Sequence, residues 1–172
     1  VILIMLIEQS GRNIKMKKKI LVLGSTGMLG HQVVNYFLGF EKYEVIDASF
    51  RKKFRDETII IDVTNKAMLE EFILNIKPDF IVNSIGVLIK GSSDAGNAIY
   101  INAYLPHLLK KIANQVTAKL IHISTDCVFS GAKGQYIESD NKDGSDVYSK
   151  TKALGEVIDD THLTLRTSII GL

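Results

Sequence analysis

A tyrosine and a lysine stand four residues apart near the end of the chain, in the run Val147-Tyr148-Ser149-Lys150-Thr151-Lys152. On a helix this spacing places Tyr148 and Lys152 on one face. A free tyrosine has a pKa of about 10, and a neighbouring ammonium would lower that pKa by favouring the phenolate. Tyr148 could then act as a general acid or base near neutral pH. The same spacing is also common on exposed helix faces, so the pair needs support from other residues.

Hydroxyl groups supply that support at the end of an apolar run. Ser124-Thr125-Asp126 follows the β-branched segment that begins at Lys119. A hydroxyl at the end of a strand could hydrogen-bond a carbonyl oxygen on which negative charge develops. Thr125, Tyr148 and Lys152 are therefore the predicted catalytic residues, and Thr125 would also contact the substrate.

A glycine-rich turn, Gly24-Ser25-Thr26-Gly27-Met28-Leu29-Gly30, lies between the apolar run Ile20–Leu23 and a segment with helical spacing. Its glycines would let the backbone approach a pyrophosphate, and the helix start offers unpaired N–H groups. An ordinary strand-to-helix turn is the alternative. Because the turn follows a strand and precedes a helix, we predict that Gly24, Thr26, Gly27, Met28, Leu29 and Gly30 bind a dinucleotide.

Residues near the ends of later strands predict the rest of the cofactor site. If the second strand ends at Ser49, Arg51 and Lys52 could hold a 2′-phosphate, which favours NADP; if Asp47 is at the tip, NAD is favoured. We prefer NADP, although these cations could equally belong to a solvated loop. Asp62-Val63 could reach an adenine, or cap a helix. The run Ser84-Ile85-Gly86 would lie along the cofactor at the carboxyl edge of the sheet, or form a plain turn.

The pattern from Lys19 onward alternates short β-branched runs with amphipathic segments, which predicts an α/β fold with a doubly wound parallel sheet. The expected strands are Ile20–Leu23, Glu44–Ala48, Thr58–Ile61, Phe80–Asn83, Lys119–Ser124 and Leu163–Arg166. The expected helices are Met28–Leu38, Lys66–Ile76, Ala98–Gln115 and Ser145–Asp159. Pro106 should kink or interrupt the third helix. The irregular stretch from Phe129 to Gly144 is expected to be an active-site loop.

Length and composition favour one domain. The chain has 172 residues, of which 46% are hydrophobic, and a net charge of +2 without a long basic run, so nucleic-acid binding is not expected. Seven apolar residues at the start are too few to span a membrane, and we take residues 1–15 as an extension outside the domain at 16–172. The single cysteine, Cys127, excludes an internal disulfide and a cysteine metal cluster; we expect no metal and a cytoplasmic protein.

Taken in order, these motifs resemble a known family. The turn at 24–30, Asp62-Val63, Ile101-Asn102-Ala103, the run 122–129 and the run 148–156 are similar to those of the extended short-chain dehydrogenase/reductases, and most of all to the dTDP-4-dehydrorhamnose reductase subgroup. The resemblance implies an NAD(P)-dependent reductase of a keto group on a deoxysugar nucleotide. It implies that Tyr148 donates the proton and that Lys152 binds the nicotinamide ribose. Asn102 would order the site, and Val87 and Lys90 would face the substrate.

Some features depart from the subgroup. Cys127 stands where the subgroup usually has tyrosine, and Thr151-Lys152 replaces a serine-lysine pair. Relatives carry a further C-terminal substrate domain, so the chain is expected to be an N-terminal fragment. The resemblance also implies a homodimer built on the helices at 98–115 and 145–159.

Two alternatives to a reductase stay open. One is an epimerase or dehydratase of nucleotide sugars, although no Glu follows Thr125 and Asp126 as a dehydratase would require. The other is a non-catalytic regulatory subunit on the same fold, similar to the beta subunit of methionine adenosyltransferase.

Overall fold

A computed structural model describes residues 17–88 and 94–168. The extension at 1–15 and the predicted substrate residue Lys90 lie outside the described residues.

Six parallel strands form one sheet in the order β3-β2-β1-β4-β5-β6. In chain order the strands are β1 (Lys18–Leu23), β2 (Tyr43–Ser49), β3 (Ile59–Ile60), β4 (Phe80–Asn83), β5 (Lys119–Thr125) and β6 (Leu163–Thr167). Their β-branched and leucine-rich sequences suit strands that are covered on both faces. Strands β2 and β3 lie on one side of β1, and the chain then crosses back to place β4, β5 and β6 on the other side, so the strand order switches between β1 and β4. The carboxyl ends of all the strands lie at one edge of the sheet. The predicted doubly wound parallel sheet is confirmed.

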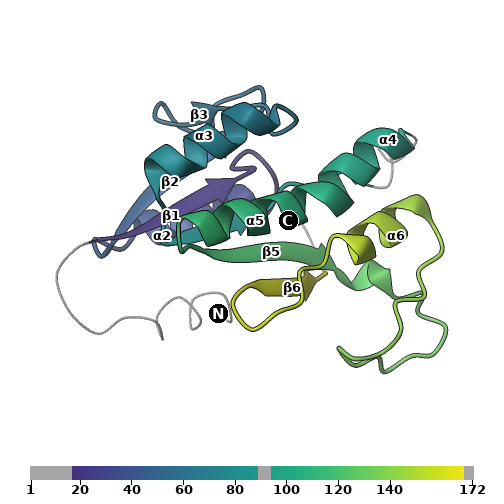
Figure 1. Cartoon of the computed structure of the whole chain (residues 1–172). Coiled ribbons are helices and arrows are strands. Elements are labelled where there is room, and N and C mark those ends of the chain that lie inside the picture. Colours follow the sequence, from purple (N-terminus) through teal and green to yellow (C-terminus); the bar gives the residue numbers. More distant parts are fainter. Residues whose placement is uncertain (1–16, 89–93, 169–172) are drawn as a thin grey trace.

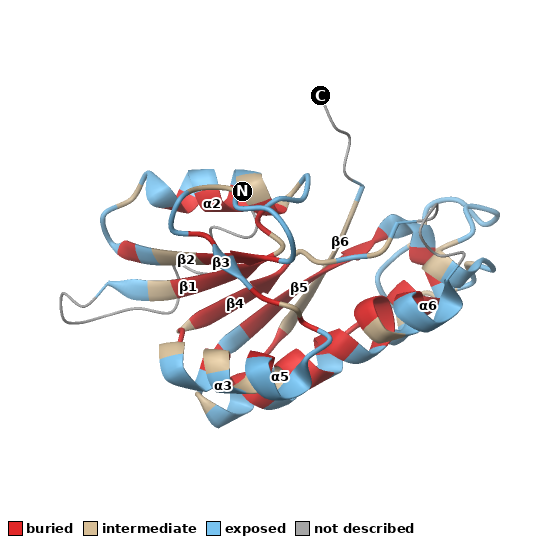
Figure 2. Cartoon of the chain, turned by 90° about the horizontal axis from the view of Figure 1, so that it is seen from above, coloured by how far each residue is buried: buried red, intermediate tan, exposed pale blue. Residues whose placement is uncertain are grey.

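Helices cover both faces of this sheet (Figures 1 and 2). Helix α2 (Gly30–Leu38) packs on one face, where Phe37 and Val34 join Ile20 and Val22 in a buried cluster. Helices α3 (Lys66–Ile76) and α5 (Leu105–Gln115) pack on the other face, where their apolar residues form a second cluster with alternate residues of the strands. The period of two along each strand therefore divides the core into two layers.

The helix expected at Ala98–Gln115 begins three residues earlier and contains a wide turn. Its parts are α4 (Ala95–Ala98), the π-helical segment η2 (Ile99–Tyr104) and α5. The N–H of Leu105 bonds to Tyr100 O, five residues back. The next residue, Pro106, has no N–H to donate, and the wider turn accommodates that loss without ending the helix. The prediction of a local disturbance at Pro106 is confirmed, and its form is a π-helical turn.

The last predicted helix is shorter than expected. Helix α6 (Val147–Leu154) begins after Asp146, whose side chain accepts a hydrogen bond from Ser149 N, and it ends at the C-cap Gly155. A Cβ on Gly155 would lie 1.8 Å from Asn102 O, so the chain passes directly against η2 at this point. That close crossing ends the helix at Leu154 instead of Asp159. A short 3-10 turn, η3 (Asp126–Val128), follows β5.

Candidate functional site

The glycine turn between β1 and α2 is held in a form that only glycine allows at two positions. Gly24 has a φ of +89°, a region that other residues rarely adopt. A Cβ on Gly30 would lie 2.0 Å from Gly24 O, so the start of α2 presses on the turn. These two contacts form a cradle of bare backbone at the start of a helix, which is the arrangement that phosphate groups bind.

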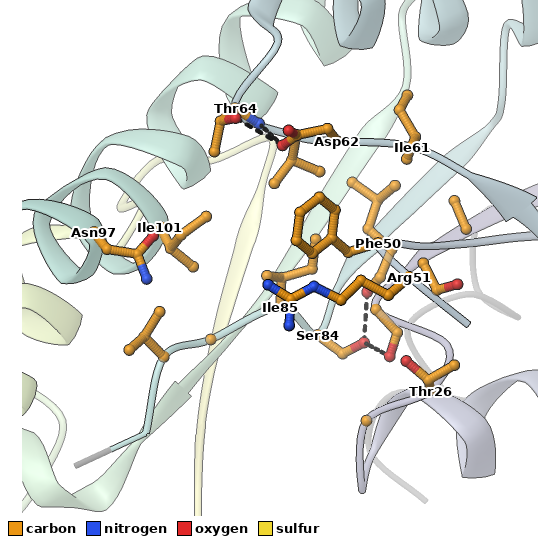
Figure 3. A pocket seen from close by; sticks show the side chains of 18 residues that line it. Thr26, Phe50, Arg51, Ile61, Asp62, Thr64, Ser84, Ile85, Asn97 and Ile101 are labelled. Carbon is orange, nitrogen blue, oxygen red and sulfur yellow. Dashed lines mark hydrogen bonds between the residues drawn. The ribbon is translucent and has the colours of Figure 1, made fainter. Parts of the chain in front are cut away.

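A cavity of about 500 Å³ opens above this turn at the carboxyl edge of the sheet (Figure 3). Its volume is in the range of small-molecule and cofactor sites. Predicted residues that line it are Gly24, Thr26, Gly27, Ser49, Arg51, Asp62, Val63, Ser84, Ile85, Gly86 and Val87. Met28, Leu29 and Gly30 are not among the lining residues; Gly30 shapes the turn from behind. The sequence predicted no cofactor contact for Phe50, Thr64, Asn97 or Ile101, which also line the cavity.

Asp47, the carboxylate that could have bound the ribose of NAD, does not lie at the carboxyl end of β2. It is paired with Val22 inside the sheet, and its side chain is buried. Its two oxygens accept hydrogen bonds from Arg55 Nε at 2.6 Å and from Thr58 Oγ1 at 2.7 Å. Asp47 therefore tethers the loop between β2 and β3 and does not face the cavity. Sequence reasoning missed Arg55, because its partner lies eight residues away across an irregular loop.

Arg51 does reach the cavity. Its guanidinium lies 4.9 Å from the ring centre of Phe50, which is exposed, and both side chains extend over the cavity in Figure 3. A cation at this place carries its charge into the open end of the cavity. Lys52, the second predicted phosphate ligand, is not among the residues that line the cavity, and its carbonyl accepts a hydrogen bond from Ser49 Oγ.

Two predicted cofactor residues also have structural roles. Asp62 Oδ1 accepts hydrogen bonds from Thr64 N at 2.9 Å and Thr64 Oγ1 at 2.7 Å, so Asp62 stabilises the turn before α3, whereas the N-cap of that helix is Asn65. Ser84 Oγ donates to Leu23 O at 2.6 Å and joins the ends of β1 and β4. Both side chains still line the cavity.

The hydroxyl beside Tyr148 belongs to Thr125. The Thr125 side chain is buried at the end of β5, within hydrogen-bonding reach of Tyr148, and its Oγ1 donates to Asp126 Oδ1 at 3.2 Å and accepts from Cys127 N at 3.2 Å. Ser124 points elsewhere and donates to Glu156 Oε1 at 2.9 Å. Tyr148 and Thr125 thus form a pair at the carboxyl edge, to which β5 and α6 each contribute one residue.

The expected effect of Lys152 on Tyr148 is wrong in this structure. Burial raises the pKa of Tyr148 above its ordinary value, and the hydrogen bond with Thr125 opposes that rise only in part. Lys152 donates from Nζ to Ile123 O at 2.6 Å. Burial of this side chain lowers the pKa of Lys152 to about 8, while Glu156 acts in the opposite direction. Lys152 is thus held against β5, and its pKa lies close to neutral pH.

Asn102 clamps the loop after β4. Its Oδ1 accepts from Val87 N at 2.8 Å, and its Nδ2 donates to Val87 O at 3.0 Å and to Thr151 Oγ1 at 3.2 Å. This buried amide joins the cavity wall to the helix that carries Tyr148 and Lys152. The ordering contact expected of Asn102 is thus made with backbone and with Thr151.

A buried histidine beneath the site was not singled out by the sequence. Asn83 Oδ1 accepts from Ile85 N at 3.2 Å, so its Nδ2 is the group that faces His122 Nδ1, at 3.1 Å. Burial, followed by the charge of Lys152, lowers the pKa of His122 to about 3. His122 is therefore neutral at physiological pH and supports Asn83, which in turn shapes the cavity turn at Ile85.

Within the described ranges 17–88 and 94–168, no group of three His, Cys, Asp or Glu side chains is placed to hold a metal ion. The same part of the chain contains no helix that is both long enough and apolar enough to cross a bilayer.

The strand order, the glycine turn between β1 and α2, and the cavity at the switch between β1 and β4 define a Rossmann-type α/β domain. A family model described as the RmlD substrate binding domain matches residues 17–170, and the chain belongs to this family. The resemblance to extended, sugar-nucleotide-reductase-like short-chain dehydrogenase/reductases is confirmed by this match and by the relatives below.

The chain is 29% identical over 157 residues to dTDP-4-dehydrorhamnose reductase of Aggregatibacter actinomycetemcomitans, covering 87% of this chain and 51% of that protein. Among solved structures it is similar to a hypothetical dTDP-4-dehydrorhamnose reductase from Sulfolobus tokodaii, with 30% identity and a TM-score of 0.80 over 88% of this chain and 55% of that one. It is also similar to dTDP-4-dehydrorhamnose reductase from Bacillus anthracis in complex with NADP, with 26% identity and a TM-score of 0.75 over 90% of this chain and 54% of that one. The chain thus spans about half the length of the relatives it matches.

Proposed function

We propose that this chain is the cofactor-binding and catalytic part of an NAD(P)-dependent reductase that acts on the keto group of a deoxysugar nucleotide. One observation carries the proposal: the cavity wall at Gly86 adjoins the catalytic lysine. A Cβ on Gly86 would lie 3.9 Å from Lys152 Nζ and 3.7 Å from Asn102 Oδ1. A cofactor that entered at the glycine turn and extended to Gly86 would therefore end beside Lys152 and the Thr125–Tyr148 pair.

The residues fit a nicotinamide dinucleotide. The bare backbone at Gly24 and Gly30 suits a pyrophosphate, and the turn 84–86 suits the nicotinamide half. When bound, such a cofactor supplies a hydride for a carbonyl carbon. Thr125 would orient the carbonyl oxygen, Tyr148 would give it a proton, and Lys152 would bind the nicotinamide ribose. The raised pKa of Tyr148 keeps its proton in place until the oxygen gains negative charge.

NADP is the preferred cofactor of this proposal. Asp47, the carboxylate on β2 that could select NAD by binding the ribose hydroxyls, is instead bound to Arg55 and Thr58. Arg51 brings a guanidinium to the open end of the cavity, where it could pair with a 2′-phosphate. The relative from Bacillus anthracis was solved with NADP, which supports the same choice.

Two variants test these assignments. In the full-length protein, Tyr148→Phe removes the acid and should lower turnover of dTDP-4-dehydrorhamnose about 100-fold or more while leaving NADPH binding unchanged. Full turnover by this variant would refute the catalytic assignment.

Arg51→Ala should weaken NADPH binding about 10- to 100-fold and leave NADH binding unchanged, because one charge-assisted contact is worth about 1.5–3 kcal/mol. Equal effects on the two cofactors would refute the role of Arg51.

A non-catalytic role is the second candidate, because the chain is also 27% identical over 143 residues to the beta subunit of methionine adenosyltransferase 2 of Bos taurus. Tight NADPH binding with no reduction of any nucleotide sugar would favour it. The paired Thr125 and Tyr148 favour the enzyme.

An epimerase or dehydratase is distinguished by its cofactor: it would keep NAD(H) bound during purification and would consume no NADPH. A cytoplasmic location and a homodimer belong to the same proposal.

A further inference from the structure

One carboxylate beneath the catalytic residues has more partners than its sequence position suggests. The chain turns inward after Gly155, and Glu156 is buried, with 1% of its side chain exposed. Glu156 Oε1 accepts hydrogen bonds from Ser124 Oγ at 2.9 Å and from Arg166 Nε at 2.7 Å. Glu156 Oε2 accepts from Arg166 at 2.8 Å and pairs with Lys142 Nζ at 2.8 Å.

These contacts join three parts of the molecule that meet at the catalytic edge. Ser124 immediately precedes Thr125 at the end of β5, and Arg166 lies in β6, the neighbouring strand. Lys142 belongs to the loop that returns to η3 and α6. A carboxylate with both oxygens bound in this way has a fixed orientation, since the Arg166 guanidinium meets it in a bidentate pair.

The loop from Phe129 to Gly144 packs against Arg166, the residue that forms the bidentate pair with Glu156. The Arg166 guanidinium stacks at 4.9 Å on Phe129, where the loop begins, and Arg166 Nη1 donates to Glu138 O at 3.0 Å. At the other end of the loop, a Cβ on Gly144 would lie 2.7 Å from Cys127 O and 2.5 Å from Ser149 Cβ. The chain is thus tightly packed between η3 and α6 at Gly144, and the loop contacts Arg166, the main partner of Glu156.

We propose that Glu156 is a positioning residue for the catalytic group: its carboxylate holds the end of β5 and the 129–144 loop in one arrangement, and its charge acts on the ammonium of Lys152. This inference rests on the proposed function, because it assigns a role in the same site. Glu156 touches neither the cavity nor the Thr125–Tyr148 pair, so it acts through Ser124 and through its charge.

The charge of Glu156 has an effect beyond its own ion pairs, because it also acts on Lys152. Burial would raise the pKa of Glu156, but hydrogen bonds from Arg166, Lys142 and Ser124 outweigh burial and hold that pKa at about 2. The carboxylate is therefore ionised at neutral pH, and it opposes the loss of charge that burial imposes on Lys152. The other titratable groups that interact with Lys152 or Glu156 are His122 on β5, Arg166 on β6 and Lys142 in the loop.

Nuclear magnetic resonance titration of the lysine side chains tests the role of this charge in the chain itself. The Lys152 signal is identified by its absence from a Lys152→Arg variant. In the wild-type chain it should titrate near 8, well below an ordinary lysine. Glu156→Gln keeps an acceptor for Ser124 but removes the charge, so the midpoint should fall by about half a unit or more. Glu156→Asp restores the charge and should bring the midpoint back towards the wild-type value.

Asp159→Asn is the matched control. Asp159 also forms an ion pair, with Lys110 Nζ at 2.7 Å, but its other partners lie in the 159–162 turn. This variant should leave the Lys152 midpoint unchanged. A Glu156→Gln variant with the wild-type midpoint, or an equal shift in Asp159→Asn, would overturn the proposal.

A second variant keeps the test usable if Glu156→Gln does not fold. Lys142→Met removes a cation that is one-quarter exposed and leaves Arg166 in place. The Glu156 carboxylate is then less compensated, so the Lys152 midpoint should rise; a midpoint that does not rise counts against the proposal. NADPH binding by the wild-type chain is measured separately. Failure there would refute the proposed function while the titration still decides the role of Glu156.

Discussion

The glycine turn offers the sharpest quantitative test, through the substitution Gly30→Ala. The new Cβ would lie 2.0 Å from Gly24 O, 2.7 Å from Gly24 C and 2.8 Å from Ser84 Oγ. Two of these three atoms belong to backbone, and Cβ contacts below 3.0 Å are essentially never seen. The turn and the start of α2 must therefore separate by about 1 Å.

That movement has two measurable costs. Separating packed backbone in this way destabilises a protein by about 1–3 kcal/mol, which urea unfolding of the wild-type and variant chains would measure. Moving the turn also displaces at least one N–H group from the place where we propose that it binds the pyrophosphate. A hydrogen bond to a charged group is worth about 1.5–3 kcal/mol, so NADPH should bind about 10- to 100-fold more weakly. Fluorescence titration or calorimetry would measure this loss.

Gly96→Ala provides the control for Gly30→Ala. Gly96 lies in α4 and would place its Cβ 3.4 Å from Asp94 Oδ1, an ordinary contact. Alanine is the better helix former, so this variant should be as stable as the wild type or slightly more so, with unchanged NADPH affinity. If Gly30→Ala bound NADPH as tightly as Gly96→Ala does, the turn would not be the pyrophosphate site, and the reasoning from its geometry would be refuted.

Two further predictions concern the groups beneath the site. Folding lowers the pKa of His122 from 6.5 to about 3. Between pH 6.5 and about pH 3, His122 is therefore protonated in the unfolded chain but neutral in the folded one. The free energy of unfolding should fall as the pH is lowered through this range, by up to about 1.4 kcal/mol per pH unit. Urea unfolding at pH 7, 6 and 5 should show a shallower fall for His122→Gln, and identical slopes would contradict the buried neutral histidine. Gly155→Ala places a Cβ 1.8 Å from Asn102 O and should destabilise the chain by about 1–3 kcal/mol relative to Gly96→Ala; thermal stability equal to that of the wild type would show that α6 does not cross η2 so closely.

Much of the fold follows from local sequence. The helix Lys66–Ile76 and the strand Phe80–Asn83 have the predicted bounds, since apolar periodicity and the capping Asn65 act within a few residues. The predicted turn at 24–30 is present because it depends on glycines and on the flanking strand and helix. The expected end of α6 at Asp159 is wrong: Gly155, a residue typical of helix ends, is the C-cap, and a close approach to Asn102, more than fifty residues away along the chain, leaves room only for glycine there.

By itself the sequence determined the order of strands and helices, the glycine turn and the set of polar residues at the carboxyl edge. Only the tertiary structure decided how those polar residues are used. It placed the Thr125 hydroxyl beside Tyr148 and paired Ser124 with Glu156, and it buried Asp47 against Arg55 while Arg51 faces the cavity. The physical reason is that propensity and periodicity are set by near neighbours, whereas the burial, partner and charge state of a polar group are set by residues that meet only when the sheet is assembled.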